Sequence, residues 1–159
     1  MTTECTERID QGPGQWVHIS PGERFKIRTS TADTGGVYVM LELIADFEHG
    51  TRMHIHENED EHFIVLEGML HIANGDKTFN APPGTALTVT KGMPHAWCNL
   101  SETPLRMLVT FSPGHIEGLF KEVASRDSDD VAAILRKYGC RFVGPPLSET
   151  IRAFDPSRS

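Results

Sequence analysis

Three histidines and four carboxylates lie within nine residues, in the segment HIHENEDEH that begins at position 54. Successive side chains of a strand point to opposite faces, so His54 and His56 share one face, with Cα atoms about 6.6 Å apart. Two imidazoles at that separation can converge on one metal ion. Glu61 lies five positions after His56, which leaves room for a tight turn that brings the next strand back beside the two histidines. His95 directly follows a Gly-Met-Pro turn, and a neighbouring strand can place it opposite the pair. The alternative is a solvated acidic loop that happens to contain histidines.

The segments that carry these side chains have the pattern of short β-strands. Between positions 24 and 111 apolar residues mostly alternate with polar ones or form β-prone runs, as in RFKIRTS, VYVMLELIA and HFIVLEG. Turn signals separate the strands, namely NGD at 74–76, PPG at 82–84, KGMP at 91–94 and SETP at 101–104. Many short strands with such turns predict an all-β sandwich or barrel.

After position 112 the apolar residues recur at helical spacing. The two sets are Ile116, Leu119, Phe120 and Val123, and then Val131, Ile134, Leu135 and Tyr138. Asp127 or Ser128 is placed to cap the second helix, and Gly139 is placed to end it. Residues 114–143 carry five basic and five acidic groups, so their net charge is zero. A DNA-binding helix-turn-helix is expected to be positively charged, so this segment does not favour one. We therefore expect two helices packed outside the strands.

The composition excludes several classes of partner. A chain of 159 residues is one domain by length, and its net charge of −7 argues against nucleic acid and against anionic membrane surfaces. No stretch approaches the ~20 apolar residues that span a bilayer, and the polar, acidic N-terminus is unlike a secretory signal. Cys5, Cys98 and Cys140 are widely spaced and form no C-x-x-C pair. Reduced thiols in a cytoplasmic protein are therefore expected.

The spacing of these residues resembles the two motifs of the cupin superfamily. The first motif, G-x5-H-x-H-x3–4-E-x6-G, is matched at His54, His56, Glu61 and Gly68, although Glu48 stands where the opening glycine is expected. The second motif, G-x5-P-x-G-x2-H-x3-N, is matched at Gly84, Gly92, His95 and Asn99, with Thr90 in place of the proline. Both departures fall at turn or edge positions and leave the four ligand positions intact. Within the superfamily, the chain resembles small single-domain members of the quercetinase-like or uncharacterised branch.

The resemblance implies a cupin-type antiparallel β-barrel, which is a double-stranded β-helix or jelly roll. It also implies one divalent metal ion held by three histidines and a glutamate. Imidazole with one carboxylate suits Fe, Mn, Ni, Co, Cu or Zn, and four protein ligands leave coordination positions open. The expected parts are an N-terminal arm with the first strand (1–34), the barrel (35–112), and two helices with a tail (113–159), in one structural domain. The tail KYGCRFVGPPL also resembles that of some small cupins, and its Gly-Pro-Pro predicts an extended segment across the barrel.

Residues near the predicted ligands are candidates for the wall of a substrate pocket. Phe63 and Trp97 each lie two positions beyond a ligand, so alternation puts them on the ligand-bearing face, with plain barrel core as the alternative. Arg52 lies two positions before a ligand and can hold an anionic substrate or form a surface salt bridge. Met107 fits either the pocket or the core, because methionine fills gaps in both.

Two further histidines have weaker claims to the metal. His62 directly follows Glu61, so regular alternation turns its side chain away from the ion. The alternative is that His62 binds the metal in place of one of the four ligands. His71 lies between Leu70 and Ile72 and is expected on the outer, solvated face.

Three functions are compatible with such a site. The first is a metal-dependent enzyme acting on a small organic molecule, in particular a quercetinase-like dioxygenase in which Glu61 both ligates the ion and accepts a substrate proton. An isomerase or decarboxylase is the alternative reaction. The second is a non-catalytic module that binds or senses a small molecule. The third, a metal-free epimerase-like cupin, should lack the full ligand set that this chain has. A homodimer is also expected, formed by barrel faces or by exchange of N-terminal strands that carry the apolar patch Trp16–Ile19.

Overall fold

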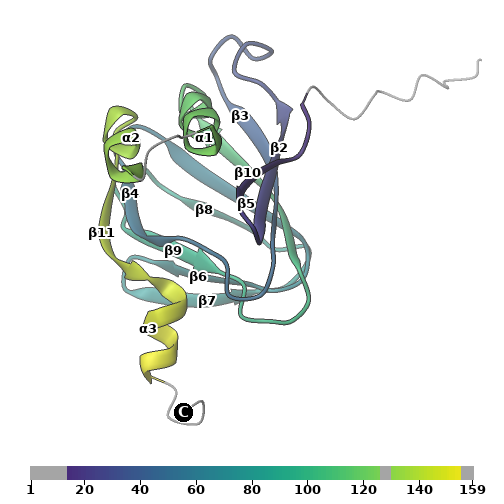
Figure 1. The fold of residues 1–159 in the computed structure, drawn as a ribbon, viewed down its shortest axis with the longest axis vertical. Helices are drawn as coiled ribbons and strands as arrows, with labels where there is room; N and C mark the ends of the chain where they lie inside the picture. The colour runs from purple at the N-terminus through teal and green to yellow at the C-terminus, as the bar shows by residue number, and fades with distance from the viewer. Residues whose placement is uncertain (1–13, 126–129, 155–159) are drawn as a thin grey trace, which may run out of the picture.

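The fold consists of two antiparallel β-sheets with three short helices in the described part of the chain (Figure 1). The computed structural model describes residues 14–125 and 130–154. One sheet has six strands in the order β1-β2-β3-β10-β5-β8, and the other has five in the order β11-β4-β9-β6-β7. The strands are β1 Val17–Ser20, β2 Glu23–Thr29, β3 Val39–Ala45, β4 Arg52–His56, β5 Asp60–Glu67, β6 Leu70–Asn74, β7 Lys77–Ala81, β8 Ala86–Val89, β9 His95–Cys98, β10 Leu105–Ser112 and β11 Cys140–Pro146.

The all-β architecture expected from the alternating pattern is confirmed. The two sheets are separate and do not close into one continuous barrel. The Asn-Gly signal is a hairpin turn between β6 and β7, with Gly75 at φ 64, a left-handed conformation that such turns require.

The core lies on the inward faces of the strands. Along β10 the side chains alternate between buried and half-buried, because β10 pairs with β3 on one side and with β5 on the other. Its buried positions are Leu105, Met107, Val109 and Phe111.

Helices α1 (Glu117–Ala124) and α2 (Val131–Lys137) confirm the two predicted amphipathic segments. The cap of α2 is Asp130, whose side chain accepts a hydrogen bond from the backbone N–H of Ala133 at 2.9 Å. The expected caps, Asp127 and Ser128, lie outside the described residues. Gly139 follows α2 at φ 68 and ends it as predicted, since glycine readily takes this conformation.

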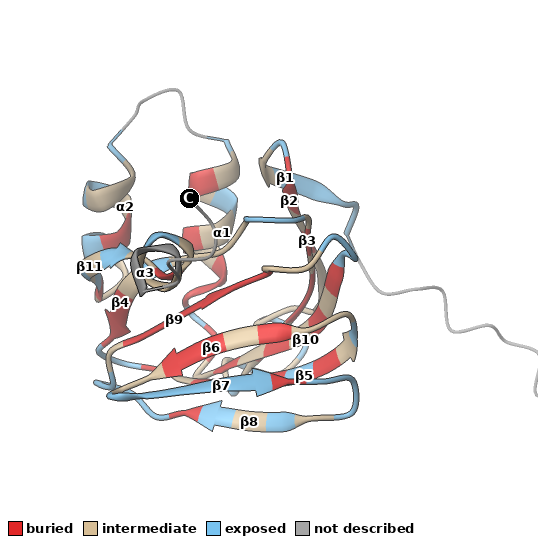
Figure 2. Cartoon of the chain, turned by 90° about the horizontal axis from the view of Figure 1, so that it is seen from below, coloured by how far each residue is buried: buried red, intermediate tan, exposed pale blue. Residues whose placement is uncertain are grey.

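The C-terminal segment contains more structure than the sequence indicated. The predicted extended segment is strand β11, which pairs with β4. Helix α3 (Leu147–Phe154) follows directly and was not predicted. Figure 2 shows α1, α2 and β11 gathered at one end of the molecule, whereas the exposed strands β7 and β8 lie at the other. Among the described helices, none is long and apolar enough to span a membrane.

The turn before β4 explains how the chain accommodates its missing motif glycine. Glu48 adopts φ 69, the left-handed conformation that favours glycine, at the position where the motif has one. Gly50 has a different role, because a Cβ there would lie 2.2 Å from the carbonyl oxygen of Trp97. This glycine therefore permits the close approach of the chain before β4 to strand β9.

Candidate metal centre

Three strands bring four potential metal ligands together. His54 and His56 come from β4, Glu61 from the start of β5, and His95 from the start of β9. His54 and His95 are direct partners in the antiparallel pairing of β4 with β9. One ligand atom from each of the four residues lies within 4.8 Å of the others, and all four side chains are buried. The cluster predicted from residue spacing is therefore assembled in the fold.

Backbone carbonyl groups orient two of the imidazole rings. Nδ1 of His54 lies 2.8 Å from the carbonyl oxygen of Arg52, and Nδ1 of His95 lies 2.9 Å from that of Met93. A carbonyl oxygen only accepts, so Nδ1 of each ring carries the hydrogen. Nε2 of each ring, when neutral, therefore presents a lone pair to the cluster, which is the arrangement that supports metal ligation.

The contacts within the cluster require a positive charge or shared protons. Nε2 of His54 lies 3.1 Å from Nε2 of His56, and Nε2 of His95 lies 2.7 Å from a carboxylate oxygen of Glu61. Two acceptor atoms repel at such distances unless a proton or a cation lies between them. A divalent cation can take the place of these protons, so the donor set fits a metal ion.

The protonation states of the four residues also favour ligation. Burial, together with the neighbouring His95 and His56 rings, lowers the pKa of His54 to about 3, so this imidazole is neutral at pH 7. Burial alone would raise the pKa of Glu61, but hydrogen bonds from His56 and His95 outweigh burial and hold that pKa below its usual range. For His95, burial opposes protonation, yet the hydrogen bond with Glu61 raises the net pKa. A metal ion must therefore compete with protons at the His95 ring.

The remaining histidines near the cluster point elsewhere. Nδ1 of His62 lies 2.9 Å from the hydroxyl of Thr88, away from the four ligands, as alternation predicted. Nδ1 of His71 contacts the side-chain oxygen of Asn80 at 2.5 Å on the outer surface. Neither residue belongs to the group that can hold a metal ion.

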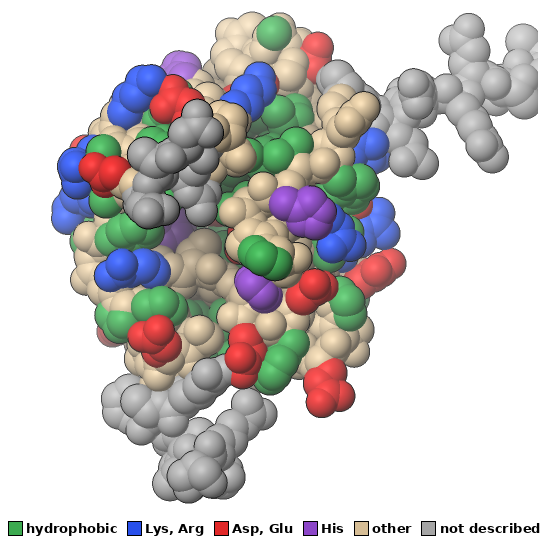
Figure 3. All heavy atoms as spheres, in the orientation of Figure 1, with side chains coloured by type: hydrophobic (Ala, Val, Ile, Leu, Met, Phe, Trp, Pro, Cys, Tyr) green, Lys and Arg blue, Asp and Glu red, His purple; other side chains and the backbone are tan. Residues whose placement is uncertain are grey.

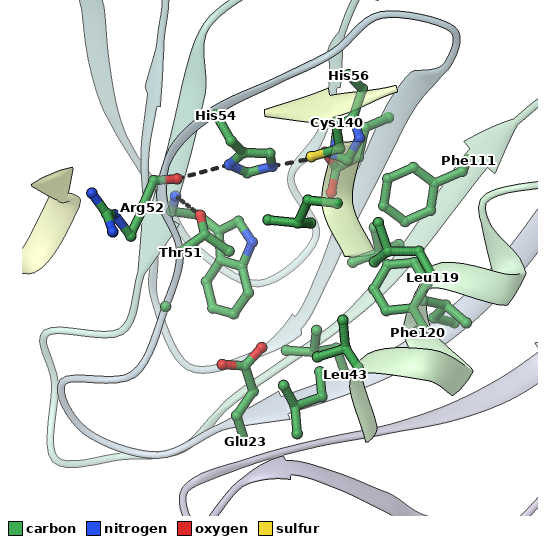
Figure 4. Close-up of a pocket in the computed structure, with 18 of the residues that line it drawn as sticks. Glu23, Leu43, Thr51, Arg52, His54, His56, Phe111, Leu119, Phe120 and Cys140 are labelled. Carbon is green, nitrogen blue, oxygen red and sulfur yellow. Dashed lines mark hydrogen bonds and ion pairs between the residues drawn. The ribbon is translucent and has the colours of Figure 1, made fainter. Parts of the chain in front are cut away.

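A cavity of about 270 Å³ adjoins the cluster. Figure 3 shows hydrophobic side chains gathered on the face between the helices and strands β1 and β2. The close-up in Figure 4 shows His54 and His56 on one side of the cavity, with Phe111 and Phe120 on another. His54, His56 and Glu61 lie in its wall, whereas His95 does not line it.

Two of the four predicted pocket residues line this cavity. Arg52 and Trp97 lie in the wall. Phe63 and Met107 do not line it, and both are fully buried in the hydrophobic core. For both residues the structure thus agrees with the alternative position in the core.

Several lining residues escaped the sequence analysis. Helices α1 and α2 contribute Leu119, Phe120, Val123, Val131 and Leu135, and β11 contributes Cys140 and Phe142. The helices do lie outside the strands, but their apolar faces also close one side of the cavity. Burial raises the pKa of the Cys140 thiol to about 12, so this thiol is not a nucleophile at neutral pH.

Glu23 is the other lining residue that the sequence analysis missed. It begins β2 and shares its face with Phe25, so the alternation of RFKIRTS extended by one residue would have turned it inward. Burial raises the pKa of Glu23 to about 7, and no charged neighbour contributes to this shift. The wall therefore holds a carboxyl group that titrates near neutrality.

Residues 43–111 match the family model described as the Cupin domain. This part of the chain is therefore similar to cupin domains. All four clustered ligands lie within the matched residues. No curated protein matches the sequence significantly.

Solved structures share the cupin fold over most of their length. KdgF from Halomonas sp. has a TM-score of 0.59 at 20% identity, with 65% of this chain and 92% of that chain covered. The polyketide cyclase RemF from Streptomyces resistomycificus has a TM-score of 0.59 at 18% identity and covers 94% of both chains. The Cupin_2 domain of an XRE-family transcriptional regulator from Enterobacter cloacae has a TM-score of 0.52 at 18% identity, with 57% of this chain and 96% of that chain covered. At these identities the likeness concerns the fold alone.

The raised pKa of Glu23 predicts a pH-dependent loss of stability. Below pH 4.5, its ordinary value, the carboxyl is protonated in both the folded and the unfolded chain and makes no difference. Between pH 4.5 and about 7 only the unfolded chain ionises, so the free energy of unfolding falls as pH rises. Above pH 7 the loss is constant at about 3 kcal/mol, from about 1.4 kcal/mol per pKa unit.

Glu23→Gln should therefore be more stable than the wild type at pH 8, and this advantage should disappear towards pH 4. Urea unfolding of the chelator-treated proteins across that range measures the difference. Glu102→Gln, a change of an exposed carboxylate, is the control and should show no such trend. A stability difference between Glu23→Gln and wild type that stays constant with pH would contradict the assignment.

Proposed function

We propose that this cupin domain binds one divalent transition-metal ion through His54, His56, Glu61 and His95, and that the protein is a metal-dependent enzyme acting on a small organic molecule. The observation that carries the proposal is the position of four buried ligand atoms within 4.8 Å of one another, beside an apolar cavity. Structural metal sites are closed by their ligands, whereas catalytic sites keep an open position. Three of these four residues line the cavity, which supports a catalytic site.

The donor set restricts the metal to a group of ions. Three imidazoles and one carboxylate suit Fe(II), Mn(II), Ni(II), Co(II), Cu(II) or Zn(II), and a fully oxygen-coordinated ion such as calcium is disfavoured. When bound, such an ion supplies a Lewis acid or a redox centre.

The residues of the chain would supply the other requirements of catalysis. Glu61 stays ionised over the working pH range, and it is our candidate for accepting a substrate proton. The apolar walls exclude water, which strengthens electrostatic interactions inside the cavity. Arg52 lies in the wall with its guanidinium 4.7 Å from the ring centre of Phe142, and it forms no ion pair with a described residue. Its Nε donates to the carbonyl of Gly144 at 3.3 Å, and Arg52 is our candidate for holding an anionic substrate group at the rim of the cavity.

Within this class we favour a dioxygenase-like reaction resembling that of quercetinase, with an isomerase or decarboxylase as the alternative. The polyketide cyclase RemF covers 94% of this chain, which supports an enzymatic role for this form of the fold. Oxygen uptake with flavonols and diketones, measured on metal-loaded protein, tests the reaction. Uptake should cease when the metal is chelated and return when it is restored.

The second candidate is a non-catalytic module that binds or senses a small molecule. The similarity to the cupin domain of the Enterobacter cloacae regulator supports this alternative. Tight binding of a small molecule without turnover under any of the above conditions would favour sensing over catalysis.

Loss of one ligand should remove most of the bound metal while the fold persists. His54→Ala or His95→Ala is expected to weaken Mn(II) or Ni(II) binding by at least about 100-fold, since even the loss of an outer hydrogen-bond partner of a ligand costs about 10–100-fold. His62→Ala is the matched control, because this neighbouring histidine faces Thr88, and its affinity should equal that of the wild type. Calorimetric titration measures all three. A triple variant of His54, His56 and His95 that keeps one equivalent at full affinity would show the site to be elsewhere.

The same titration at pH 5 and pH 7.5 provides an independent check. The raised pKa of His95 means that protons compete with the metal as pH falls, so the affinity should be at least about 10-fold lower at pH 5. Equal affinities at the two pH values would argue against ligation by histidine.

We also propose that the protein forms a homodimer. Strand β1 is the last strand of its sheet, and its Val17 and the preceding Trp16 are 36% and 39% exposed. An exposed edge with apolar side chains needs cover. Light scattering at micromolar concentration should therefore give the mass of a dimer. If N-terminal strands form the interface, Trp16→Ser with Val17→Lys should weaken it, whereas Phe79→Ser on β7, a side chain 47% exposed, should not. The reverse result would favour an interface between barrel faces, and a monomeric wild type would exclude the dimer.

A further inference from the structure

Glu23 occupies an unusual position for an acidic residue. It is the first residue of β2, is only 9% exposed and lines the cavity. In Figure 4 its carboxyl group turns into the cavity, beside Leu43 and on the opposite side from His54 and His56. The side chain thus presents a polar group to the interior of an otherwise apolar space.

This carboxyl group has no partner in the described part of the chain. It forms no hydrogen bond and no ion pair there. Glu42, a comparably buried carboxylate, is bonded to Arg106 at 2.6 Å and paired with Arg28 at 3.3 Å. Burial of a polar group without a partner is unfavourable. Glu23 therefore has hydrogen-bonding capacity that only a molecule inside the cavity can use.

Few other polar side chains share the wall with Glu23. Besides the metal-ligand residues they are Thr51, Arg52 and Cys140. The hydroxyl oxygen of Thr51 already accepts a hydrogen bond from the backbone N–H of Trp97, with 3.1 Å between nitrogen and oxygen. The rest of the wall is hydrophobic, with aromatic rings from Trp97, Phe111, Phe120 and Phe142. A ligand thus meets polar groups in separate places, with apolar contacts between them.

We propose that Glu23 is a specificity-determining residue whose carboxyl group hydrogen-bonds a hydroxyl group of a small, neutral, ring-containing ligand, the other polar end of which lies at the metal-ligand cluster. The second half of this statement rests on the proposed function, whereas the contact with Glu23 does not. The cavity of about 270 Å³ is smaller than the roughly 300–1,000 Å³ typical of sites for drug-sized ligands. One or two rings fill it.

Charge argues for a neutral hydroxyl group and against an amine. A divalent ion with three neutral imidazoles and the Glu61 carboxylate has a net charge of +1, and Arg52 adds another positive charge to the same wall. A cationic ligand would be repelled by both. The titration of Glu23 near pH 7 fits this assignment, because the group can then act as a donor or as an acceptor toward a hydroxyl.

Binding of 2-naphthol and naphthalene to metal-free protein tests the contact. The two probes share the same rings, and chelation removes any ligation of the hydroxyl by metal. The preference for naphthol, taken as the ratio of the two dissociation constants, should be about 10-fold larger in the wild type than in Glu23→Leu, the size of one buried hydrogen bond. Fluorescence titration measures both constants, and Glu102→Gln serves as the control with an unchanged preference. Equal preferences in wild type and Glu23→Leu would overturn the proposal.

A second variant keeps the test valid if Glu23→Leu does not fold. The Glu23 carboxyl of the wild type ionises between pH 6 and pH 8, and this should weaken the binding of naphthalene more than that of naphthol. The preference for naphthol should therefore rise with pH. Glu23→Gln should show a preference that does not change with pH, because the amide does not titrate. The other titratable groups near Glu23 are Arg52, Cys140 and the metal-ligand residues in the wall, and His49 against Gly22. All of them are retained in the variant, so the same pH dependence in Glu23→Gln and wild type would also overturn the proposal.

The test separates this proposal from the metal-dependent function. If the protein binds no metal but shows the Glu23-dependent preference, the contact with Glu23 stands and the enzyme proposal fails. If the metal binds as expected but the preference does not depend on Glu23, the ligand contact is refuted and the metal site stands.

Discussion

The buried charge of Glu61 is the constraint on which the centre depends. A carboxylate that is 4% exposed is stable only when neighbouring groups compensate its charge. The compensation comes from His56 and His95, at 3.3 and 2.7 Å, which belong to two different strands. Strand β5 must therefore begin beside both β4 and β9. A shift of one residue in the register of β4 would turn both of its histidines to the opposite face and leave the carboxylate poorly compensated.

The four ligands were predictable because strand alternation and motif spacing are properties of the sequence itself. Their geometry as a cluster depends on pairings between distant segments, such as His54 opposite His95. Alternation also has a limit, which Phe63 illustrates. Phe63 faces inward as expected but is buried in the core, whereas its strand partner Val109 lines the cavity. Alternation specifies the face of a strand and not the depth along it.

The walls of the cavity were harder to predict than its ligands. The apolar stripes of α1 and α2 indicated that both helices pack on something, but a stripe does not identify its partner. Strand β11 was expected only as an extended tail, and its pairing with β4 brings Phe142 opposite His54. Helix α3 was not predicted, because the Gly-Pro-Pro segment before it suggested that the extended tail continued. In each case the missing information is tertiary, since these elements fold against surfaces formed by residues far away in sequence.

Glu23 and Glu61 show how the same burial has opposite effects on two carboxyl groups of one cavity. Burial favours the neutral acid in both. For Glu61 the histidines outweigh it and the pKa falls, whereas Glu23 has no such partner among the described residues and its pKa rises to about 7. The cavity thus contains one carboxylate that its histidine neighbours keep ionised and one whose charge changes near neutral pH. Pairs of carboxyl groups whose environments separate their pKa values are typical of sites that assign different roles to the two groups. The difference between the two pKa values also favours one orientation of a ligand. A molecule with two different polar ends can form favourable contacts with both carboxyl groups only when each end lies at the group that suits it.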